Sequence, residues 1–219
     1  MKNNIITPLF FRRLLVYVLG NFVLAAGVVL TVKSDLGISP INSPSLVLSN
    51  IFTIDLGLMT AIIYASFVLL QFAILGKNFK IYSFLQIAMN LIFSFFVSLC
   101  TRLLSFSVPE LYALRISFHL LGIAFIGLGI SIYLRTKMLP LPPEGLVLAI
   151  SQRFGWKPHN VKVCVDCSAI VVAVIISLAA TGSIFGVREG TLIAMIGIGK
   201  SMGFFTKHLG QKIDTMFRL

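Results

Sequence analysis

The sequence predicts an all-α polytopic membrane protein with six transmembrane helices, arranged as two inverted three-helix repeats. Two observations predict this fold class. The chain of 219 residues is 58% hydrophobic and 11% charged, whereas charged residues make up about a quarter of a soluble domain. In addition, residues of the first half recur in the second half at a nearly constant spacing. Each repeat is expected to contain one segment that is broken by proline and re-enters the membrane.

Six apolar runs have the length of a membrane-spanning helix, since about 20 helical residues cross a hydrocarbon core of about 30 Å. They cover residues 13–32, 58–75, 81–103, 111–134, 161–180 and 191–208. Basic residues precede the first run, as in a secretory signal, but the later runs and the lack of a convincing cleavage site predict a transmembrane helix instead. We expect residues 1–107 to form the first repeat and residues 108–219 the second.

The net charge of +11 is explained by membrane topology rather than by nucleic-acid binding. If the N-terminus is cytoplasmic, most basic residues, including Lys2 and Arg218, fall on the cytoplasmic side, as the positive-inside rule requires. A seventh span over residues 36–54 reverses this distribution, so six spans explain the charges better. We therefore expect a multi-pass protein with two cytoplasmic termini, whose surface contacts the lipid bilayer and no nucleic acid.

The internal repeat is clearest in the first span of each half. Pairs of residues 102 positions apart are identical or similar there: Arg13 and Arg115, Gly20 and Gly122, Gly27 and Gly129, Ser34 and Thr136. Further on, the offset is expected to become 100, which aligns Pro40 with Pro140 and residues 46–48 with residues 146–148. Because each half holds an odd number of spans, the halves enter the membrane from opposite sides, and the repeat is inverted.

A segment broken by proline follows the first span of each half, at residues 36–48 and 138–148. Paired broken segments in repeated halves are the best indication that a sequence gives of a transporter's binding site. In one interpretation both segments re-enter the membrane, where non-helical backbone must be buried by protein or line a water-filled space. In the alternative interpretation both are ordinary surface loops rich in turn-forming residues.

Local chemistry favours a short helix after each break. Asn42 or Ser43 suits the cap of such a helix and Pro44 its first helical position, and Pro143 with Glu144 repeats that arrangement. The free N–H groups and the positive dipole end at a helix start favour an anionic group. These five residues are therefore candidates for substrate binding.

Ionisable residues inside spans usually face the bundle interior and mark a pathway. Asp166 in the fifth span and Lys200 in the sixth are two such residues. Asp166 either pairs with Lys162, which lies four residues earlier on the same helix face, or shares a cavity with Lys200. Asn90 in the third span matches Lys200 at an offset of 110, and it is either a further substrate contact or an interhelical hydrogen bond.

Cys164 and Cys167 form a Cys-x-x-Cys pair, which raises the alternative of a membrane thiol oxidoreductase. Against that alternative, the pair is expected near the cytoplasmic side, where thiols stay reduced. Three Cys and three His form no closed set of metal ligands, so we expect neither a metal nor a cofactor. Gly199 and Gly203 have the spacing that brings helix backbones close. We expect them to pack within one chain, with a homodimer as the alternative.

Three short segments carry a family resemblance: residues 33–40 (KSDLGISP), 162–166 (KVCVD) and 186–191 (GVREGT). Together they resemble the YczE/YyaS/YitT group of bacterial integral membrane proteins, which has a Leu-Gly-x-x-Pro element after the first helix, an acidic residue early in the fifth and a Gly-Thr pair opening the sixth. The resemblance implies a bacterial inner membrane and no established substrate. The second half departs from the pattern at residues 138–140, where the glycine is absent, and Lys200 matches no family motif.

These observations predict a transporter or permease, rather than an enzyme, that binds an anionic or zwitterionic metabolite near the midplane between the repeats. The sequence has no nucleotide-binding motif, so ATP would act only through ATPase partner subunits, as in an energy-coupling complex. A non-transporting accessory protein and a thiol oxidoreductase are two competing hypotheses. The candidate binding residues are Asn42, Ser43, Pro44, Asn90, Pro143, Glu144, Asp166 and Lys200.

Overall fold

The computed structural model describes residues 8–108 and 110–217, and all regular structure within them is helical. Lys2 and Arg218, which were expected in the cytoplasm, lie outside the described residues. The α-helices are α1 (Pro8–Lys33), α2 (Ser43–Phe52), α3 (Leu56–Leu75), α4 (Leu85–Leu103), α5 (Tyr112–Arg135), α6 (Pro142–Phe154), α7 (Pro158–Thr181) and α8 (Glu189–Phe217). Short 3-10 helices are η1 (Pro40–Asn42), η2 (Gly76–Asn78) and η3 (Ile81–Phe84).

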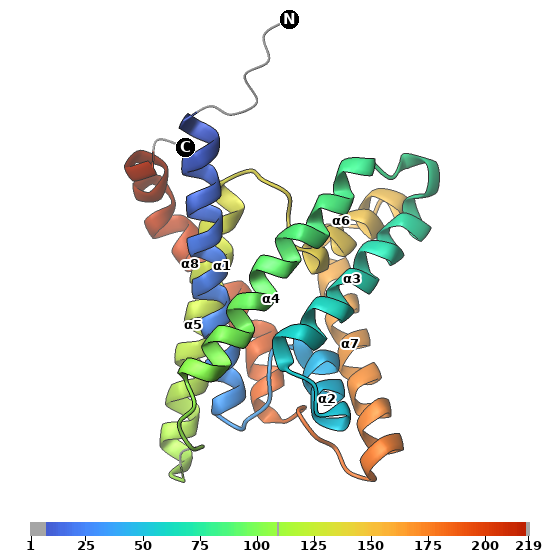
Figure 1. The fold of residues 1–219 in the computed structure, drawn as a ribbon, viewed down its shortest axis with the longest axis vertical. Coiled ribbons are helices and arrows are strands. Elements are labelled where there is room, and N and C mark those ends of the chain that lie inside the picture. Colours follow the sequence, from blue (N-terminus) through green and yellow to red (C-terminus); the bar gives the residue numbers. More distant parts are fainter. Residues whose placement is uncertain (1–7, 109, 218–219) are drawn as a thin grey trace, which may run out of the picture.

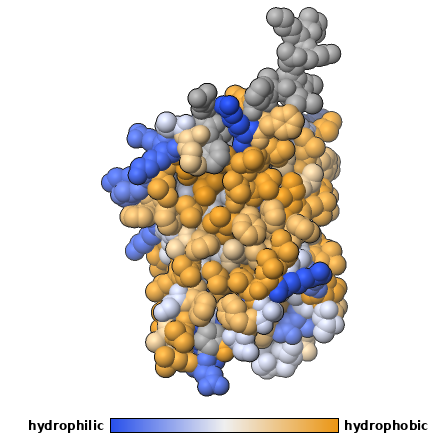
Figure 2. Space-filling model, turned by 60° about the vertical axis from the view of Figure 1, so that its left-hand side comes forward, coloured by the Kyte–Doolittle hydropathy of each residue, from blue (hydrophilic) through white to orange (hydrophobic). Residues whose placement is uncertain are grey.

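Five of the described helices are long and apolar enough to cross a membrane, namely α1, α3, α4, α5 and α7. A broad hydrophobic band covers the middle of the face in Figure 2, and most hydrophilic residues on that face lie toward its two ends. The protein is therefore membrane-embedded. The sixth predicted span lies within α8, which is 29 residues long. That helix is not among the five, and it carries Lys200, Lys207 and Lys212.

Consecutive long helices run in opposite directions (Figure 1). The helix α1 begins and α8 ends at the same end of the molecule, which we call the terminal end. The short helix α6 lies near the terminal end, whereas α2 lies near the opposite end. The two short helices, which we call the half-helices, therefore occupy opposite ends of the bundle.

The closest helix crossing joins α1 to α5, through glycines that recur at the offset of 102. A Cβ on Gly27 would lie 2.7 Å from the carbonyl oxygen of Gly122, and a Cβ on Gly122 would lie 2.8 Å from that of Gly27. Gly20 and Gly129 form a second contact of the same kind. Backbones approach this closely only at small residues. The two contacts correspond to each other at the offset of 102, because Gly27 corresponds to Gly129 and Gly20 to Gly122.

The turns after α1 and α5 have the same conformation. Asp35 and Lys137 have φ angles of 54° and 53°, which are uncommon for residues other than glycine. Just before them, Ser34 Oγ and Thr136 Oγ1 each accept a hydrogen bond from the backbone N–H two residues later, at 3.2 and 3.3 Å. Both pairs of residues are 102 positions apart, so the local structure repeats as the sequence does.

The two half-helices also end alike. Thr53 and Gly155 end them in the left-handed conformation. Ser49 Oγ and Ser151 Oγ each donate a hydrogen bond to the carbonyl oxygen five residues later, at 2.6 and 2.5 Å. The structural offset is therefore still 102 at the end of the half-helices.

The expected change to an offset of 100 is thus wrong for this segment. It aligned Pro40 with Pro140 through a shared apolar triplet, but such triplets are common in membrane helices and define the register poorly. The matched turns on both sides of the half-helices align Pro40 with Pro142, and they align Asn42 with Glu144.

The starts of the half-helices differ from the expected caps. Asn42 precedes α2, but its side chain makes no capping hydrogen bond, and Pro44 is the second residue of the helix rather than the first. The helix α6 begins at Pro142, with Pro143 and Glu144 in its first turn. The capping prediction for Asn42 is wrong because tertiary contacts use its side chain.

Each half-helix packs against the long helix that follows the other half-helix. The helix α6 lies on α3, and α2 lies on α7, in addition to the contact that each makes with its own following helix. In the first half α3 also packs on α4, whereas the corresponding helices α7 and α8 make almost no contact. The half-helices are thus enclosed by both halves, and the halves differ mainly in this last contact.

Candidate functional site

The start of α6 is held inside the bundle by two amide side chains of the first half. Gln71 on α3 donates from Nε2 to the carbonyl oxygen of Pro142 at 3.1 Å. Gln71 and Gln86 exchange two further hydrogen bonds, of 3.1 and 3.2 Å, and both are buried. Gly145 lies against this pair, because a Cβ there would approach Gln86 Oε1 to 2.6 Å. These contacts place Glu144 at the boundary between the two halves.

The start of α2 is also surrounded by polar groups. Asn42 is buried, and its Oδ1 accepts a hydrogen bond from the Tyr64 hydroxyl on α3 at 2.8 Å. Its Nδ2 donates to Ser39 Oγ at 2.7 Å. Ser43 is buried and its hydroxyl donates to the carbonyl oxygen of Ser39 at 3.4 Å. This polar group lies where η1 and α2 meet α7 of the second half.

The equivalent position in the second half carries carboxyl groups. The offset of 102 relates Asn42 to Glu144 and Tyr64 to Asp166, so a hydrogen-bonded neutral pair in one half corresponds to two acidic residues in the other. Asp166 is buried and forms an ion pair with Lys162 on the same helix. Glu144 interacts electrostatically with both of them. Positions related by the offset of 102 therefore differ in charge between the two halves.

Two tyrosines and an asparagine extend this polar group toward α1 and α5. The rings of Tyr17 and Tyr133 pack edge to face, with centroids 5.6 Å apart. Asn21 lies one helical turn after Tyr17 and donates from Nδ2 to its carbonyl oxygen at 2.8 Å. Glu144 interacts electrostatically with Tyr17, Tyr64 and Tyr133. We call the set Tyr17, Asn21, Asn42, Tyr64, Tyr133, Glu144, Lys162 and Asp166 the central polar cluster.

One comparison with known proteins gives a result. A family model described as a family of unknown function, DUF6198, matches residues 11–207. The chain belongs to the DUF6198 family. Neither a curated protein nor a solved structure matches the chain. The central polar cluster of this DUF6198 member lies entirely within the matched residues, and the resemblance to the YczE/YyaS/YitT group stays an expectation.

The structure brings some of the predicted site residues of this DUF6198 chain together. Asn42 and Ser43 lie at the start of α2, and Glu144 and Asp166 belong to the central polar cluster. Pro143 is buried in the first turn of α6 beside Glu144. Pro44 instead lines an apolar groove that is described below.

Two predicted residues lie elsewhere. Lys200 is exposed on α8, which packs on α5 and makes almost no contact with α7. The structure therefore gives Asp166 the local partner Lys162 and does not bring it to Lys200. Asn90 is buried, donates to the carbonyl oxygen of Ala61 at 2.9 Å and accepts from Ser94 at 3.2 Å. Its observed role is an interhelical hydrogen bond between α3 and α4.

Sequence reasoning missed the tyrosines of the cluster. One signal was present, because Tyr64 and Asp166 are 102 positions apart. A second signal was the spacing of Arg13, Tyr17 and Asn21, which places polar groups on one face of an otherwise apolar helix. Tyr133 carries no such signal, and only the crossing of α1 and α5 brings it to Tyr17.

An apolar groove of about 480 Å³ lies between the half-helices and α3 and α7. Its lining includes Ile63 and Val165, and Ser66 and Ser168, two pairs related by the offset of 102. Cys164 also lines it. Cys164 and Cys167 are exposed and free, and they lie on the apolar outer face of α7. The groove is therefore bounded by both halves but contains few polar groups.

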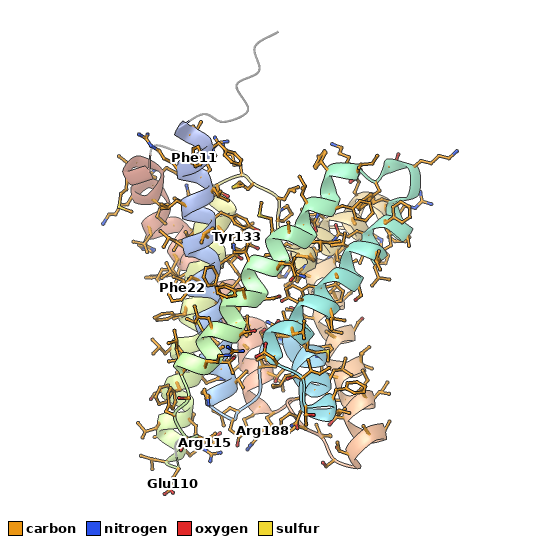
Figure 3. The ribbon with its side chains drawn as sticks, viewed as in Figure 1. Phe11, Phe22, Glu110, Arg115, Tyr133 and Arg188 are labelled. Atoms are coloured by element: carbon orange, nitrogen blue, oxygen red, sulfur yellow. The ribbon has the colours of Figure 1, made fainter. Side chains whose placement is uncertain are left out.

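A network of charged and polar groups lies at the end opposite the terminal end, where Figure 3 shows Arg115 and Arg188. Asp35 contacts the guanidinium groups of Arg115 and Arg188 at 3.0 and 3.2 Å. His119 is buried between Ser34 Oγ, at 3.1 Å, and the carbonyl oxygen of Gly190, at 2.8 Å. These contacts join the end of α1 to the starts of α5 and α8. We call them the closing network.

Proposed function

We propose that the protein is a small secondary transporter or permease that binds an anionic or zwitterionic metabolite between two inverted three-helix repeats. In this proposal six helices span a bacterial inner membrane, and both termini are cytoplasmic. One observation carries the proposal: the two half-helices start inside the bundle from opposite ends, and each packs against the other half (Figure 1). Paired broken helices of this kind hold the substrate in known secondary transporters.

The inverted repeat is supported by features that recur at one offset. The glycine contacts between α1 and α5 are exchanged by the offset of 102, and the turns at Asp35 and Lys137 have the same conformation. A sixth span is supported by α8, which runs beside α5 along the height of the bundle (Figure 1). Lys200 makes α8 less apolar, but a lysine stem can carry its ammonium group toward the membrane surface.

The difference between the halves supports alternating access. In the first half Gly57 on α3 lies against the backbone of α4, and Asn90 bonds the two helices. In the second half α7 stands away from α8, and a Cβ placed on Gly199 or Gly203 would have no described atom of another helix within 4 Å. In an inverted repeat the alternative state exchanges these two arrangements, so α7 closes on α8 while α3 leaves α4.

The charges of the central polar cluster favour a zwitterion over a simple anion. Glu144 occupies the first turn of α6, which is where the helix dipole alone favours an anion. Lys162 is paired with Asp166, so no cation of the cluster is left to offset the charge of an ionised Glu144. A zwitterionic metabolite can present a cationic group to this charge, whereas a simple anion is repelled by it.

Uptake by the purified, reconstituted protein tests the proposal. Proteoliposomes would be offered a broad panel of radiolabelled metabolites, with protein-free liposomes as the blank and Asp166→Asn as the site variant. We expect at least one metabolite to accumulate, and accumulation to fall in the Asp166→Asn variant. Uptake that is unchanged in this variant would remove Asp166 from the site.

The same preparation separates the competing functions. An accessory protein predicts neither uptake nor any ligand-dependent thermal shift across the panel. An energy-coupling subunit predicts that ATPase subunits copurify with the protein from its native membrane and that uptake requires ATP. A thiol oxidoreductase predicts that activity is lost when Cys164 and Cys167 are replaced by serine.

A further inference from the structure

Four buried oxygen atoms on α1, α5 and α6 make no hydrogen bond of good geometry to another described residue. They are the hydroxyl oxygens of Tyr17 and Tyr133, Asn21 Oδ1 and Glu144 Oε2. Two pairs of these side chains, Tyr133 with Glu144 and Tyr17 with Asn21, lie close enough to interact. The two tyrosines are 0% and 1% exposed. A buried polar atom left unpaired costs about 1–3 kcal/mol, and in folded proteins nearly all such atoms have a partner. We therefore expect a group from outside the chain to supply these bonds.

The surrounding charges point to a cationic group. Glu144 interacts electrostatically with Lys162 and Asp166, but Lys162 already forms an ion pair with Asp166. The Glu144 carboxyl group thus has no full counter-charge in a region removed from water, so it is held ionised only where a cation pairs with it. A charge in such a place requires a partner of opposite sign.

The available atoms suit an ammonium group in particular. Asn21 donates from Nδ2 to the carbonyl oxygen of Tyr17, and its acceptor Oδ1 makes no hydrogen bond of good geometry to another described residue. A carboxylate accepts hydrogen bonds only, and a phenol oxygen can also accept. An ammonium group supplies three N–H donors and is attracted to the face of an aromatic ring. The edge-to-face packing of Tyr17 and Tyr133 places two rings beside these acceptors.

We propose that Glu144, Tyr17 and Tyr133 form an ammonium subsite that binds the amine end of a zwitterionic substrate. This inference rests on the proposed transport function and narrows its substrate class to zwitterions that carry an amine. A carboxylate without an amine lacks the donors that these oxygens need, and its charge is repelled by Glu144.

Arg13 provides a partner for the other end of the zwitterion. It lies one helical turn before Tyr17 on the same face of α1, and its buried Nε has no hydrogen-bond partner among the described residues. A guanidinium group matches a carboxylate in charge and geometry. Arg13, Tyr17 and Asn21 therefore form a polar line along α1 from the terminal end, and the substrate lies along this line with its amine toward Glu144. Figure 3 shows Tyr133 in the half of the molecule nearer the terminal end.

Binding of matched ligand pairs to the purified full-length protein tests this subsite. The probes are α-amino acids, each paired with the carboxylic acid that lacks the amine and with the amine that lacks the carboxylate. Thermal shift and equilibrium dialysis would be measured in detergent at neutral pH. We expect at least one amino acid to bind, and its amine-free counterpart to bind roughly 10- to 100-fold more weakly, because it leaves charged hydrogen bonds unmade.

Three variants assign the effect to residues. Glu144→Gln should weaken binding of the amino acid by roughly 10- to 100-fold, and Tyr133→Phe by a smaller factor of roughly 3 to 10, because a hydrogen bond to a neutral group is weaker. Glu110→Gln is the matched control, since Glu110 is exposed at the opposite end of the bundle (Figure 3) and the same chemical change there should leave binding unaltered. If Glu144→Gln does not fold, the Tyr133→Phe variant and the matched ligand pairs still test the subsite.

The outcomes are distinct for the subsite and for transport. Equal binding of an amino acid and its amine-free counterpart overturns the subsite, as does unchanged binding in Glu144→Gln. The subsite is also overturned if no probe binds, or if the thermal midpoint changes with pH but not with any added probe. Uptake of a metabolite without an amine would preserve the transport function and remove this inference. Amine-dependent binding without uptake would preserve the subsite and remove the transport function.

Discussion

Gly27 and Gly122 lie backbone to backbone where α1 crosses α5. A Cβ on Gly27 would lie 2.6 Å from the backbone nitrogen of Ile126 and 2.7 Å from the carbonyl oxygen of Gly122. Neither neighbour is a flexible side chain, so the contact can be relieved only by separating the two helices. The central polar cluster draws Tyr17 from α1 and Tyr133 from α5, and its geometry therefore depends on this crossing.

Replacement of Gly27 by leucine should separate α1 from α5 and destabilise the protein. Overpacking of this kind costs about 1–3 kcal/mol, and we expect a lower midpoint in thermal unfolding measured in detergent. The control is Gly199→Leu. Gly155→Leu is unsuitable because Gly155 has a φ of 71°, at which leucine itself would strain the backbone. A Cβ at Gly199 would have no described atom of another helix within 4 Å. An equal loss of stability in both variants would contradict the assignment of the crossing.

The open face of α8 gives a variant that should affect transport without affecting folding. Gly203→Leu places a large side chain where the described residues leave space, so the thermal midpoint should stay near that of the unmodified protein. If α7 closes on α8 during transport, the leucine blocks that closure and uptake by proteoliposomes should fall at least several-fold. Normal uptake in a well-folded Gly203→Leu protein would argue against closure of α7 on α8.

The closing network should control access from the end at which α2 lies. Asp35 joins Arg115 to Arg188, so Asp35→Asn removes both ion pairs and should loosen that end. The measurement is the rate at which a membrane-impermeant maleimide labels Ser39→Cys, a buried position near the network, in a protein whose native cysteines are replaced by serine. We expect faster labelling with Asp35→Asn than with the control Glu110→Gln. Equal rates would show that the ion pairs do not restrict access.

Removal of Lys162 should be more harmful than removal of the whole ion pair. Lys162→Met leaves the buried Asp166 without its partner, and for a lysine that is partly exposed the cost is about 1–3 kcal/mol. The double variant Lys162→Met with Asp166→Asn leaves no buried charge and should regain part of that stability. Thermal unfolding of the single and double variants checks this. A double variant less stable than Lys162→Met would mean that the Asp166 carboxylate has a further favourable partner.

Serine in place of both Cys164 and Cys167 should leave uptake and stability nearly unchanged. Both thiols are free and exposed on the apolar face of α7, and Cys164 borders the apolar groove rather than the central polar cluster. Comparison of uptake by the double variant and the unmodified protein tests this expectation. Loss of uptake with a normal thermal midpoint would favour a functional role for the thiol pair.

The amino-acid sequence by itself determined the long helices and the positions of the glycines that recur at the offset of 102. Each predicted span lies within or beside an observed helix, for example residues 13–32 in α1 and residues 161–180 in α7, because about 20 consecutive apolar residues in a membrane have little alternative to a helix. The glycine pairs of the repeat were also visible, since close helix crossings need small residues. These features depend on local composition, which a linear sequence contains in full.

The tertiary structure alone decided which polar residues meet. The offset through the half-helices is 102 rather than 100. With this offset Asn42 corresponds in position to Glu144, and Tyr64 corresponds to Asp166. Lys200 and Asp166 both look like functional residues in the sequence, but α8 packs on α5 and stays away from α7. Tyr133 reaches Tyr17 only through the glycine crossing. Helix packing sets the distances between side chains that are far apart in sequence, and the order of residues does not record which helices pack together.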